Sequence, residues 1–425
     1  MHTAQEKRYK IAEVEPWVDS LLGYLKAISG VKLVAVAGSY RRSRESVGDL
    51  VILVVAANDT AVMDRFVEND DVVDVLAKGA TKSSVVLRSG LQVDLRMVAS
   101  ECFGAALQYF TGSQAHNIAI RQIGRQHGLE INEYGVFKFE ERVAGDSEAS
   151  IYQAIGLSCV PPELRENRGE IEAARAGTLP RLIEMEDIKG DLHVHTDWSD
   201  GSNTLEDMIQ AALDYGLEYI AITEHSDRLK IAGGLESSRL LAQIDEIDRL
   251  NQEFSEITIL KGIEVEILQD GSLDLNDETL SRLDLVIGSI HSYFGLPLDK
   301  QTDRILRAMD HKYFSILAHP INRLIEERAP IEVDMLKVIQ KAKDRGCYLE
   351  LNSNPRRLDL YDTYCQIAKD KGVQVAIDSD SHSVASFDHL RYGVGQARRG
   401  WLEKDDVINT RPLEDLKKLL KLTMG

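Results

Sequence analysis

The chain has 425 residues, of which 44% are hydrophobic and 28% are charged, and its formal net charge is −19. This length allows two or three domains, each with its own core, and the composition is typical of a soluble globular protein. The negative charge argues against broad, non-specific binding of nucleic acid. No stretch has the apolar length of a membrane span and the N-terminus lacks a signal-peptide core, so we expect a cytoplasmic protein without a membrane partner. The four cysteines have neither metal nor disulfide spacing.

The first part of the chain has the pattern of a small sheet with helices. Apolar residues at helical spacing predict a helix within residues 8–28, and the run LVAVA at 33–37 predicts a buried strand. The segment GSYRRSRESVGDLVILVV occupies residues 38–55, and its apolar second half predicts another strand. LQVDLRMV at 91–98 predicts a third. We expect these elements to form one α/β module with a mixed sheet.

Polar residues at the strand ends are the candidate functional groups of this module. Gly38 and Ser39 directly follow a strand, where backbone amides can approach a phosphate. Positive charge for a phosphate is available from Arg41, Arg42 and Arg44. Asp49 begins the second strand, and Asp94 lies within the third. From these residues alone, two incidental aspartates in a small sheet are the simpler interpretation.

The same residues resemble the palm of the X-family DNA polymerases, which carries a GSxRR element, a GDxD strand and a later aspartate. The resemblance implies contacts with the phosphates of an incoming nucleotide from Gly38, Ser39 and Arg42. It also implies that Asp49 and Asp94 are two of three aspartates that bind Mg²⁺ or Mn²⁺. Val51 stands where the family has the remaining aspartate. Because an isopropyl group cannot coordinate a cation, we expect polymerase activity to be impaired or absent.

The segment YFTGSQAHNIAIR at 109–121 resembles the thumb motif of the same family. The resemblance implies that the nucleotide's sugar and base are flanked by Tyr109, Phe110, Gly112 and Asn117. Sequence physics alone favours core packing for the two aromatic residues, under a helix that starts near Ser113. The family normally begins with a lyase-like domain and helix-hairpin-helix motifs, whereas this sequence starts close to the palm, which implies a weak grip on the template.

From Asp191 onward, predicted strands alternate with predicted helices. HxH and SDG follow Asp191, and the strand-like segments YIAIT, ITILKGIEVEI, LDLVIGSIHS, YFSILAHP, CYLELNS and VQVAIDSDSHS come later. Helical patterns separate them near 205–213, 238–252, 301–310, 333–345 and 361–371. Alternation of this kind predicts a parallel barrel or sheet with helices outside it.

Histidines and carboxylates recur at the C-terminal ends of these strands. A lone HxH is more often a pair of solvated or core histidines than a ligand pair. Here, however, nine such residues share one position relative to the strands: His193, His195, Asp200, His225, Glu264, His291, His319, Asp380 and His382. Because the C-terminal ends of parallel strands meet at one rim, these side chains predict a metal site. Mixed imidazole and carboxylate ligands suit zinc, manganese or iron.

These nine positions resemble the polymerase and histidinol phosphatase (PHP) family, a distorted seven-stranded barrel that holds up to three divalent metals. Glu224 replaces the aspartate of the family's TDH motif, and His225 would be the ligand there. The order of palm and then PHP resembles that of prokaryotic X-family polymerases. The fold class implied is multidomain α/β, a nucleotidyltransferase-like palm and thumb followed by a distorted (β/α)7 barrel. The parts would be an N-terminal helix left over from the fingers (1–29), a palm (30–98), a thumb (99–158), a linker (159–188) and the PHP unit (189–425).

The PHP resemblance implies a DNA repair enzyme that hydrolyses phosphodiester bonds at DNA 3′ ends, as a 3′–5′ exonuclease or 3′-end-processing enzyme. Its substrate would be a gapped or 3′-ended duplex, and His195 and Asp380 would be catalytic. Arg356 and Arg357 are candidate phosphate contacts, or a solvated pair. Two alternatives stay open. One is an active gap-filling polymerase that uses deoxynucleoside triphosphates and proofreads with the PHP unit; the other is a phosphatase of a small phosphomonoester.

Overall fold

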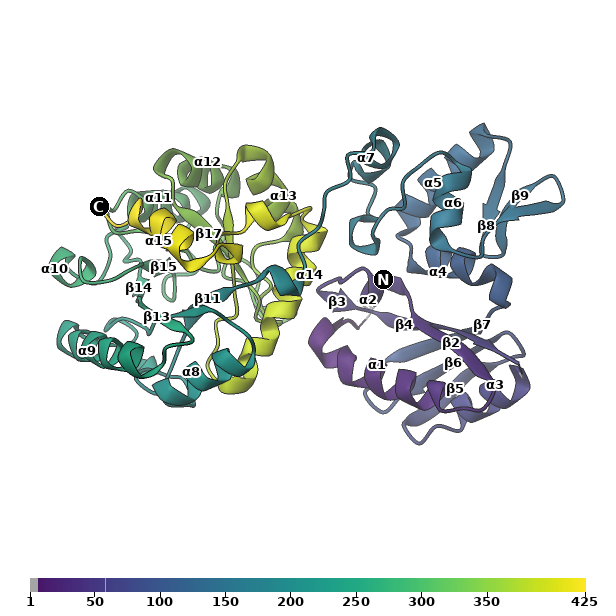
Figure 1. Ribbon diagram of the computed structural model, residues 1–425, viewed down its shortest axis with the longest axis horizontal. Coiled ribbons are helices and arrows are strands. Elements are labelled where there is room, and N and C mark those ends of the chain that lie inside the picture. The colour runs from purple at the N-terminus through teal and green to yellow at the C-terminus, as the bar shows by residue number, and fades with distance from the viewer. Residues whose placement is uncertain (1–6, 58) are drawn as a thin grey trace. The chain divides into compact units, whose positions relative to one another are not determined.

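The computed structural model describes residues 7–57 and 59–425 and divides the chain into two compact units, Met1–Leu179 and Pro180–Gly425. In Figure 1 the first unit runs from purple to blue and the second from teal to yellow. Residues 1–6, the beginning of the predicted N-terminal segment 1–29, lie outside the described residues. The division falls inside the predicted linker 159–188, so most of that segment belongs to the first unit.

In the described part of the first unit, a mixed sheet with the order β2-β4-β7-β6-β5 supports the palm-like region. The elements of this region are β1 (Tyr9–Lys10), α1 (Ile11–Lys26), β2 (Val31–Val36), α2 (Gly38–Arg41), β3 (Ser46–Val47), β4 (Asp49–Ala56), α3 (Asp59–Val67), β5 (Val72–Lys78), β6 (Lys82–Leu87) and β7 (Gln92–Met97). The sequence patterns above anticipate α1, β2, β4 and β7. They miss β5, whose side chains are mostly exposed at the sheet edge.

Alternation along β4 decides which of its residues enter the core. Leu50, Ile52 and Val54 are buried in a cluster with residues of α1 and α3. Since successive side chains of a strand point to opposite faces, Asp49 and Val51 lie on the other face of the sheet. Side chains at these two positions therefore point away from the core, on the face where a nucleotide would bind.

Residues after β7 form the thumb-like region of the first unit. Its elements are α4 (Phe103–Thr111), α5 (Gln114–Gln126), the antiparallel strands β8 (Glu130–Asn132), β9 (Gly135–Lys138) and β10 (Glu141–Ala144), and the helices α6 (Glu148–Ala154) and α7 (Glu170–Ala176). The Oγ of Ser113 caps α5 by accepting from the N–H of His116. The buried His116 ring is held between Glu170 (Nδ1 to Oε1, 2.6 Å) and Tyr152 (Nε2 to Oη, 2.8 Å), which anchors α7 to this region.

A chain of ion pairs joins three parts of the first unit around Glu148. Arg165, which is 1% exposed, donates from Nη1 to Glu148 Oε1 at 2.6 Å. Arg41 donates to both carboxylate oxygens of Glu148, at 2.8 and 2.7 Å, and to Thr111 Oγ1 at 2.7 Å. The Nε of Arg165 also donates to the carbonyl of Val160 at 2.9 Å. The network therefore ties a residue of the predicted linker to the palm-like and thumb-like regions.

Arg165→Met is expected to destabilise the first unit by about 3 kcal/mol, because it removes one partner from a buried ion pair and leaves Glu148 with Arg41 alone. Urea unfolding of the full chain, followed by tryptophan fluorescence and circular dichroism, measures the loss. The exposed Arg125, for which the described residues contain no ion pair, gives the control Arg125→Met. Equal unfolding midpoints for the two variants would contradict a stabilising role of the network.

Parallel strands with helices outside them make up the second unit (Figure 1). The elements are β11 (Gly190–Val194), α8 (Leu205–Asp214), β12 (Tyr219–Ile222), α9 (Ser237–Glu253), β13 (Thr258–Lys261), β14 (Glu264–Glu266), α10 (Asp277–Leu280), β15 (Ile287–Ser289), α11 (Leu298–Met309), β16 (Ile316–Leu317), α12 (Met335–Arg345), β17 (Tyr348–Asn352), α13 (Asp362–Lys371), β18 (Val375–Asp378), α14 (Leu390–Arg399) and α15 (Leu413–Lys421). The helices α14 and α15 follow the predicted alternation and were not anticipated from the sequence. Among residues 7–57 and 59–425, no helix is both long and apolar enough to span a membrane.

The strands of the second unit form two parallel sheets, β11-β12-β13 and β14-β15-β16-β17-β18. Isolated parallel bridges join them on both sides, between Val194 and Ser381 and between His225 and Glu264. Only Gly262 and Ile263 separate β13 from β14, so these two are one interrupted strand. A Cβ at Gly262 would lie 2.7 Å from Thr223 Cγ2 and 3.0 Å from the carbonyl of Ile222, which explains the glycine before Glu264.

Candidate functional site

The C-terminal ends of the parallel strands bring the nine candidate ligands of the second unit together. His193 lies in β11 and His195 directly follows it, while Glu264 opens β14. The remaining six lie in the segments after β11, β12, β15, β16 and β18: Asp200, His225, His291, His319, Asp380 and His382. Because all of these strands run in the same direction, residues far apart in sequence meet at one rim.

Glu264 is the centre of this arrangement and is fully buried. Its Oε2 lies 2.8 Å from His225 Nδ1, and its Oε1 lies 3.1 Å from His319 Nε2. Further contacts at 3.4 to 3.5 Å come from His193 Nε2, His195 Nε2 and His291 Nε2. One carboxylate therefore faces the nitrogens of five imidazoles from four strand ends. Such convergence of donors is typical of a metal centre and costly without a cation.

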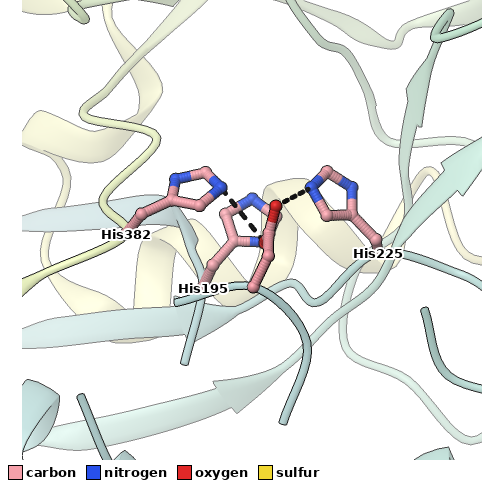
Figure 2. A group of neighbouring side chains, drawn as sticks. His195, His225 and His382 are labelled. Carbon is pink, nitrogen blue, oxygen red and sulfur yellow. Dashed lines mark ion pairs between the residues drawn. The ribbon is translucent and has the colours of Figure 1, made fainter. Parts of the chain in front are cut away.

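Asp200 and Asp380 extend the cluster on two sides. The carboxylate of Asp200 lies 3.4 Å from His225 Nε2 and 3.2 Å from His382 Nε2. Figure 2 shows the rings of His225 and His382 on either side of His195, with centroid distances of 4.5 and 4.2 Å to it. Asp380 Oδ1 lies 3.3 Å from His195 Nε2 and 3.6 Å from His193 Nε2. His195 thus belongs to two groups of side chains that could each hold an ion, one with Asp200 and one with Asp380.

Buried atoms without hydrogen-bond partners show that these residues fit divalent metals. Within the described residues, atoms of this kind include His193 Nε2, both ring nitrogens of His195, His225 Nδ1, Glu264 Oε2 and His319 Nδ1. Three overlapping groups have ligand atoms within 4.8 Å of one another: His195 with Asp200, His225 and His382; His193 with His195 and Asp380; and His225 with Glu264 and His291. Imidazole and carboxylate donors of this kind suit zinc, manganese or iron.

Outer partners turn three of the rings toward the cluster. His193 Nδ1–H donates to Glu350 Oε1 at 2.5 Å, and His291 Nδ1–H donates to Glu266 Oε2 at 3.1 Å. His382 Nδ1–H donates to the carbonyl of Asp380 at 2.9 Å. Each contact leaves the Nε2 of the ring free for a metal, the usual arrangement around metal-binding histidines.

Sequence reasoning missed Glu350, which lies within the apolar strand YLELN. Besides His193, its carboxylate accepts from the backbone N–H of His319 at 2.6 Å and from Asn352 Nδ2 at 3.2 Å. A fully buried carboxylate needs partners of this strength, so a lone glutamate in an apolar strand is the signal that could have identified it. Glu224 has a comparable supporting role, because it accepts from Thr196 and Ser199 rather than facing the cluster.

Burial and the neighbouring charges give two of the candidate ligands, His195 and Asp380, the protonation states that suit metal binding, whereas nearby carboxylates outweigh burial and raise the pKa of His225 to about 10 and that of His382 to about 9. Burial, together with the rings of His382 and His225, lowers the pKa of His195 to about 3, so that this imidazole is neutral at neutral pH. Burial raises the pKa of Asp380, but His193 and His195 hold it well below its ordinary value. A neutral imidazole and an ionised carboxylate are the forms that coordinate cations.

Glu350→Gln is expected to weaken metal binding to the full chain by about tenfold to 100-fold, because glutamine keeps the shape but loses the charge that orients His193. Titration of the metal-free protein with Zn²⁺ or Mn²⁺ against a competing chelator measures the affinity. The exposed Glu332 on the same unit gives the control Glu332→Gln. An affinity within twofold of the unmodified chain would show that Glu350 does not orient a ligand.

The candidate palm residues are arranged differently from the metal cluster. The pairing of β4 with β7 sets Val51 opposite Asp94 and Asp49 opposite Gln92. Asp94 is held by Lys82 Nζ, 2.8 Å from its Oδ2, and by Gln92 Nε2 at 3.2 Å. Within residues 7–57 and 59–425, Asp49 and Asp94 belong to no group of three possible metal ligands.

Carboxylates of the same unit contact the arginines of the GSxRR element. Gly38 and Ser39 begin the short helix α2. Arg41 pairs with Glu148, and Arg42 pairs with Glu166 at 3.1 Å while also donating to the carbonyl of Thr111 at 2.5 Å. Arg42, which the resemblance gives to the nucleotide phosphates, and Arg41, a candidate source of positive charge, are thus both bound to acidic side chains in this structure.

The thumb residues pack around the end of α4. Tyr109 and Phe110 stack edge to face with centroids 5.1 Å apart, and the Arg96 guanidinium lies 4.2 Å from the Phe110 ring. Asn117 Nδ2 donates to the carbonyl of Tyr109 at 2.7 Å. Gly112 ends α4 with a φ of +68°. A side chain at Gly112 would be strained in this conformation and would meet Arg42 Nη1 at 3.2 Å.

Fold and site together define an enzyme class, a nucleotidyltransferase-like palm and thumb joined to a PHP-type metal-dependent phosphoesterase. The family model for the DNA polymerase beta thumb matches residues 106–166, and the PHP domain model matches residues 191–354. The chain is 42% identical over 389 residues to the DNA polymerase/3′-5′ exonuclease PolX of Bacillus subtilis (strain 168), covering 91% of this chain and 68% of that protein. It therefore belongs to the X-family DNA polymerases that carry a PHP domain.

Other relatives match about half of the chain. A probable phosphatase of Thermoanaerobacter sp. (strain X514) is 30% identical over 233 residues, covering 52% of this chain and 89% of the relative. A probable phosphatase of Acetivibrio thermocellus is 30% identical over 212 residues, covering 47% of this chain and 83% of the relative.

Proposed function

We propose that the PHP unit of this chain removes nucleotides from DNA 3′ ends by metal-dependent hydrolysis of phosphodiester bonds, as a 3′–5′ exonuclease or end-processing activity in DNA repair. The observation that carries the proposal is the convergence on Glu264 of buried imidazole nitrogens without hydrogen-bond partners, those of His193, His195 and His225. The Bacillus subtilis relative, whose name includes a 3′-5′ exonuclease, extends over nearly the whole chain and supports DNA as the substrate.

Divalent ions bound here would activate water and neutralise charge on phosphoryl oxygens. We propose that the ions are held by His193, His195, Asp200, His225, Glu264, His291, His319, Asp380 and His382. The protein's own contribution is to hold these donors rigidly through the outer partners Glu350 and Glu266. Arg357 would contact a phosphate of the substrate strand close to the metals, since its Nε lies 3.8 Å from Asp380 Oδ2. Arg356 instead pairs with Glu327 at 2.5 Å.

For the palm, we propose weak or absent polymerisation. Val51 supplies no carboxylate beside Asp94, and Lys82 neutralises Asp94 from the neighbouring strand. Gly38, Ser39, Arg42, Tyr109, Phe110, Gly112 and Asn117 would then serve as a surface for the DNA end rather than for a reacting nucleotide. The second candidate, hydrolysis of a small phosphomonoester, is favoured by the likeness of about half of the chain to the probable phosphatases.

The full chain, stripped of metal and then supplied with Mn²⁺ or Zn²⁺, is expected to shorten a 5′-labelled gapped duplex from its 3′ end, and a chelator is expected to abolish the shortening. Gel electrophoresis of the products, with and without the four nucleotides, reports hydrolysis and extension together. A p-nitrophenyl phosphate reaction run in parallel tests the phosphatase alternative. Faster hydrolysis of this monoester, with the DNA left intact, would overturn the proposed function.

A further inference from the structure

Beside the metal cluster, two arginine side chains share one neutral acceptor. The Oδ1 of Asn322 accepts from Arg328 Nη2 at 2.7 Å and from Arg357 Nη1 at 3.0 Å. Asn322 is 1% exposed, and its Nδ2 donates to the carbonyl of Ile290, which turns the oxygen toward the arginines. Two positive groups this close repel each other unless an anion lies between or beside them. The arrangement of the two guanidinium groups therefore favours the binding of an anionic ligand.

The nearest carboxylates, Asp359 and Glu327, already have other partners: Asp359 accepts from the backbone N–H groups of Ile321 and Asn322, and Glu327 pairs with Arg356. In the part of the chain that the structure describes, Arg328 forms no ion pair with a carboxylate; it donates only to Asn322 and stacks on Phe294, with its Cζ 4.5 Å from the ring centroid. Within the described residues, the carboxylate that forms an ion pair with Arg357 is that of Asp380, whose Oδ2 lies 3.8 Å from Arg357 Nε. Asp380 is a candidate metal ligand, so cations in the cluster would compensate its charge and leave Arg357 for another anion.

The arginine pair lies next to the reaction centre. The N–H of Asn322 donates to the carbonyl of His319, one of the candidate metal ligands, at 2.9 Å. Arg357 links the pair to Asp380 on the adjoining strand end. A phosphate bound by Arg328 and Arg357 would thus be a neighbour of a phosphate at the metals, as successive phosphates along one DNA strand are.

An exposed aromatic residue directly precedes Phe294, the ring on which Arg328 stacks. Tyr293 is two residues after His291, is 52% exposed, and adopts a φ of +55°, which is unfavourable for a bulky side chain. Buried residues of α11 hold the loop in this conformation: Arg304 donates to the carbonyl of Ser292 at 2.9 Å, and Gln301 donates to that of Tyr293 at 3.3 Å. A rigidly held, exposed ring beside an anion site suits an unpaired base.

We propose that Arg328 and Arg357, aligned by Asn322, bind the phosphodiester adjoining the one that is cleaved, and that Tyr293 stacks on an unpaired base of the same strand. The inference rests on the proposed function and deepens it, because it makes the preferred substrate a single-stranded 3′ end of at least two nucleotides. A substrate with one phosphate and no base cannot use this subsite.

Steady-state hydrolysis of two substrates by the Mn²⁺-loaded full chain tests the proposal: a 5′-labelled oligothymidylate and the small diester methyl p-nitrophenyl phosphate. Arg328→Met is expected to lower kcat/KM on the oligonucleotide about 30-fold more than on the small diester, mainly through KM. Tyr293→Ala is expected to cost the oligonucleotide about tenfold, with Tyr293→Phe restoring it. The exposed Arg282 of the same unit gives the control Arg282→Met. Equal losses on both substrates would overturn the proposal.

A binding measurement separates failure of this inference from failure of the proposed function. In the His195→Ala background, fluorescence anisotropy of a labelled thymidylate pentamer reports affinity without hydrolysis. Adding Arg328→Met should weaken this affinity about tenfold if the subsite exists. If the affinity were unchanged while the unmodified chain still hydrolysed DNA, the subsite would be contradicted and the proposed function would stand. If the unmodified chain did not hydrolyse DNA, the proposed function itself would be contradicted.

Discussion

His195→Ala is expected to lower manganese-stimulated hydrolysis of DNA by the full chain at least about 1000-fold. His195 belongs to two of the three groups that could each hold an ion, so its loss removes a donor from both. Metal ions contribute several kcal/mol of charge stabilisation to phosphoryl chemistry, and each 1.4 kcal/mol corresponds to a tenfold change in rate. Single-turnover cleavage of a 5′-labelled 3′-ended duplex measures the loss.

His311 provides the matched control for this substitution. It lies in the same unit but pairs with Asp277 at 3.1 Å, away from the cluster. His311→Ala should keep both the rate and the metal content of the unmodified chain, whereas His195→Ala should lose bound metal when measured by plasma mass spectrometry. If His195→Ala kept more than a tenth of the activity, the cluster would not be the nuclease centre.

The meeting of the nine candidate ligands at one rim could be predicted because it depends on strand direction. An apolar run followed by His or Asp predicts a polar residue at the C-terminal end of a strand. The C-terminal ends of parallel strands lie together at one rim. His193 and Glu264, for example, are 71 residues apart yet lie in ion-pair contact at 3.4 Å. The motif positions carry this information without knowledge of the packing around them.

Contacts across the fold could not be foreseen in the same way. Glu350 sits in an apolar strand and becomes informative only when His193 is seen against it. Lys82 belongs to a strand that the sequence patterns did not predict, so its ion pair with Asp94 was also missed. Similarly, the prolines and charges of 160–170 suggested a linker, whereas Arg165 and Glu170 are buried against the first unit. Such partners are fixed by tertiary structure rather than by local pattern.

Val51→Asp is expected to raise nucleotide incorporation by the palm at least about 100-fold over the unmodified chain. The register of β4 and β7 places residue 51 opposite Asp94 and two residues from Asp49, on the face away from α1 and α3. An aspartate there would give this face a third carboxylate, which two-metal phosphoryl transfer needs to bridge both cations. The gain corresponds to only part of the several kcal/mol that metals supply.

Primer extension on a gapped duplex with Mg²⁺ or Mn²⁺ measures this gain, with His195→Ala in the same chain so that hydrolysis does not shorten the product. Lys82→Met added to Val51→Asp should increase extension further, since Lys82 competes with cations for Asp94. Asp49→Ala in the Val51→Asp chain should abolish it. Efficient extension by the unmodified palm, lost on Asp49→Ala, would instead mean that Asp49 and Asp94 suffice. Val51 would then tune the palm without silencing it, and the chain would combine polymerisation with hydrolysis.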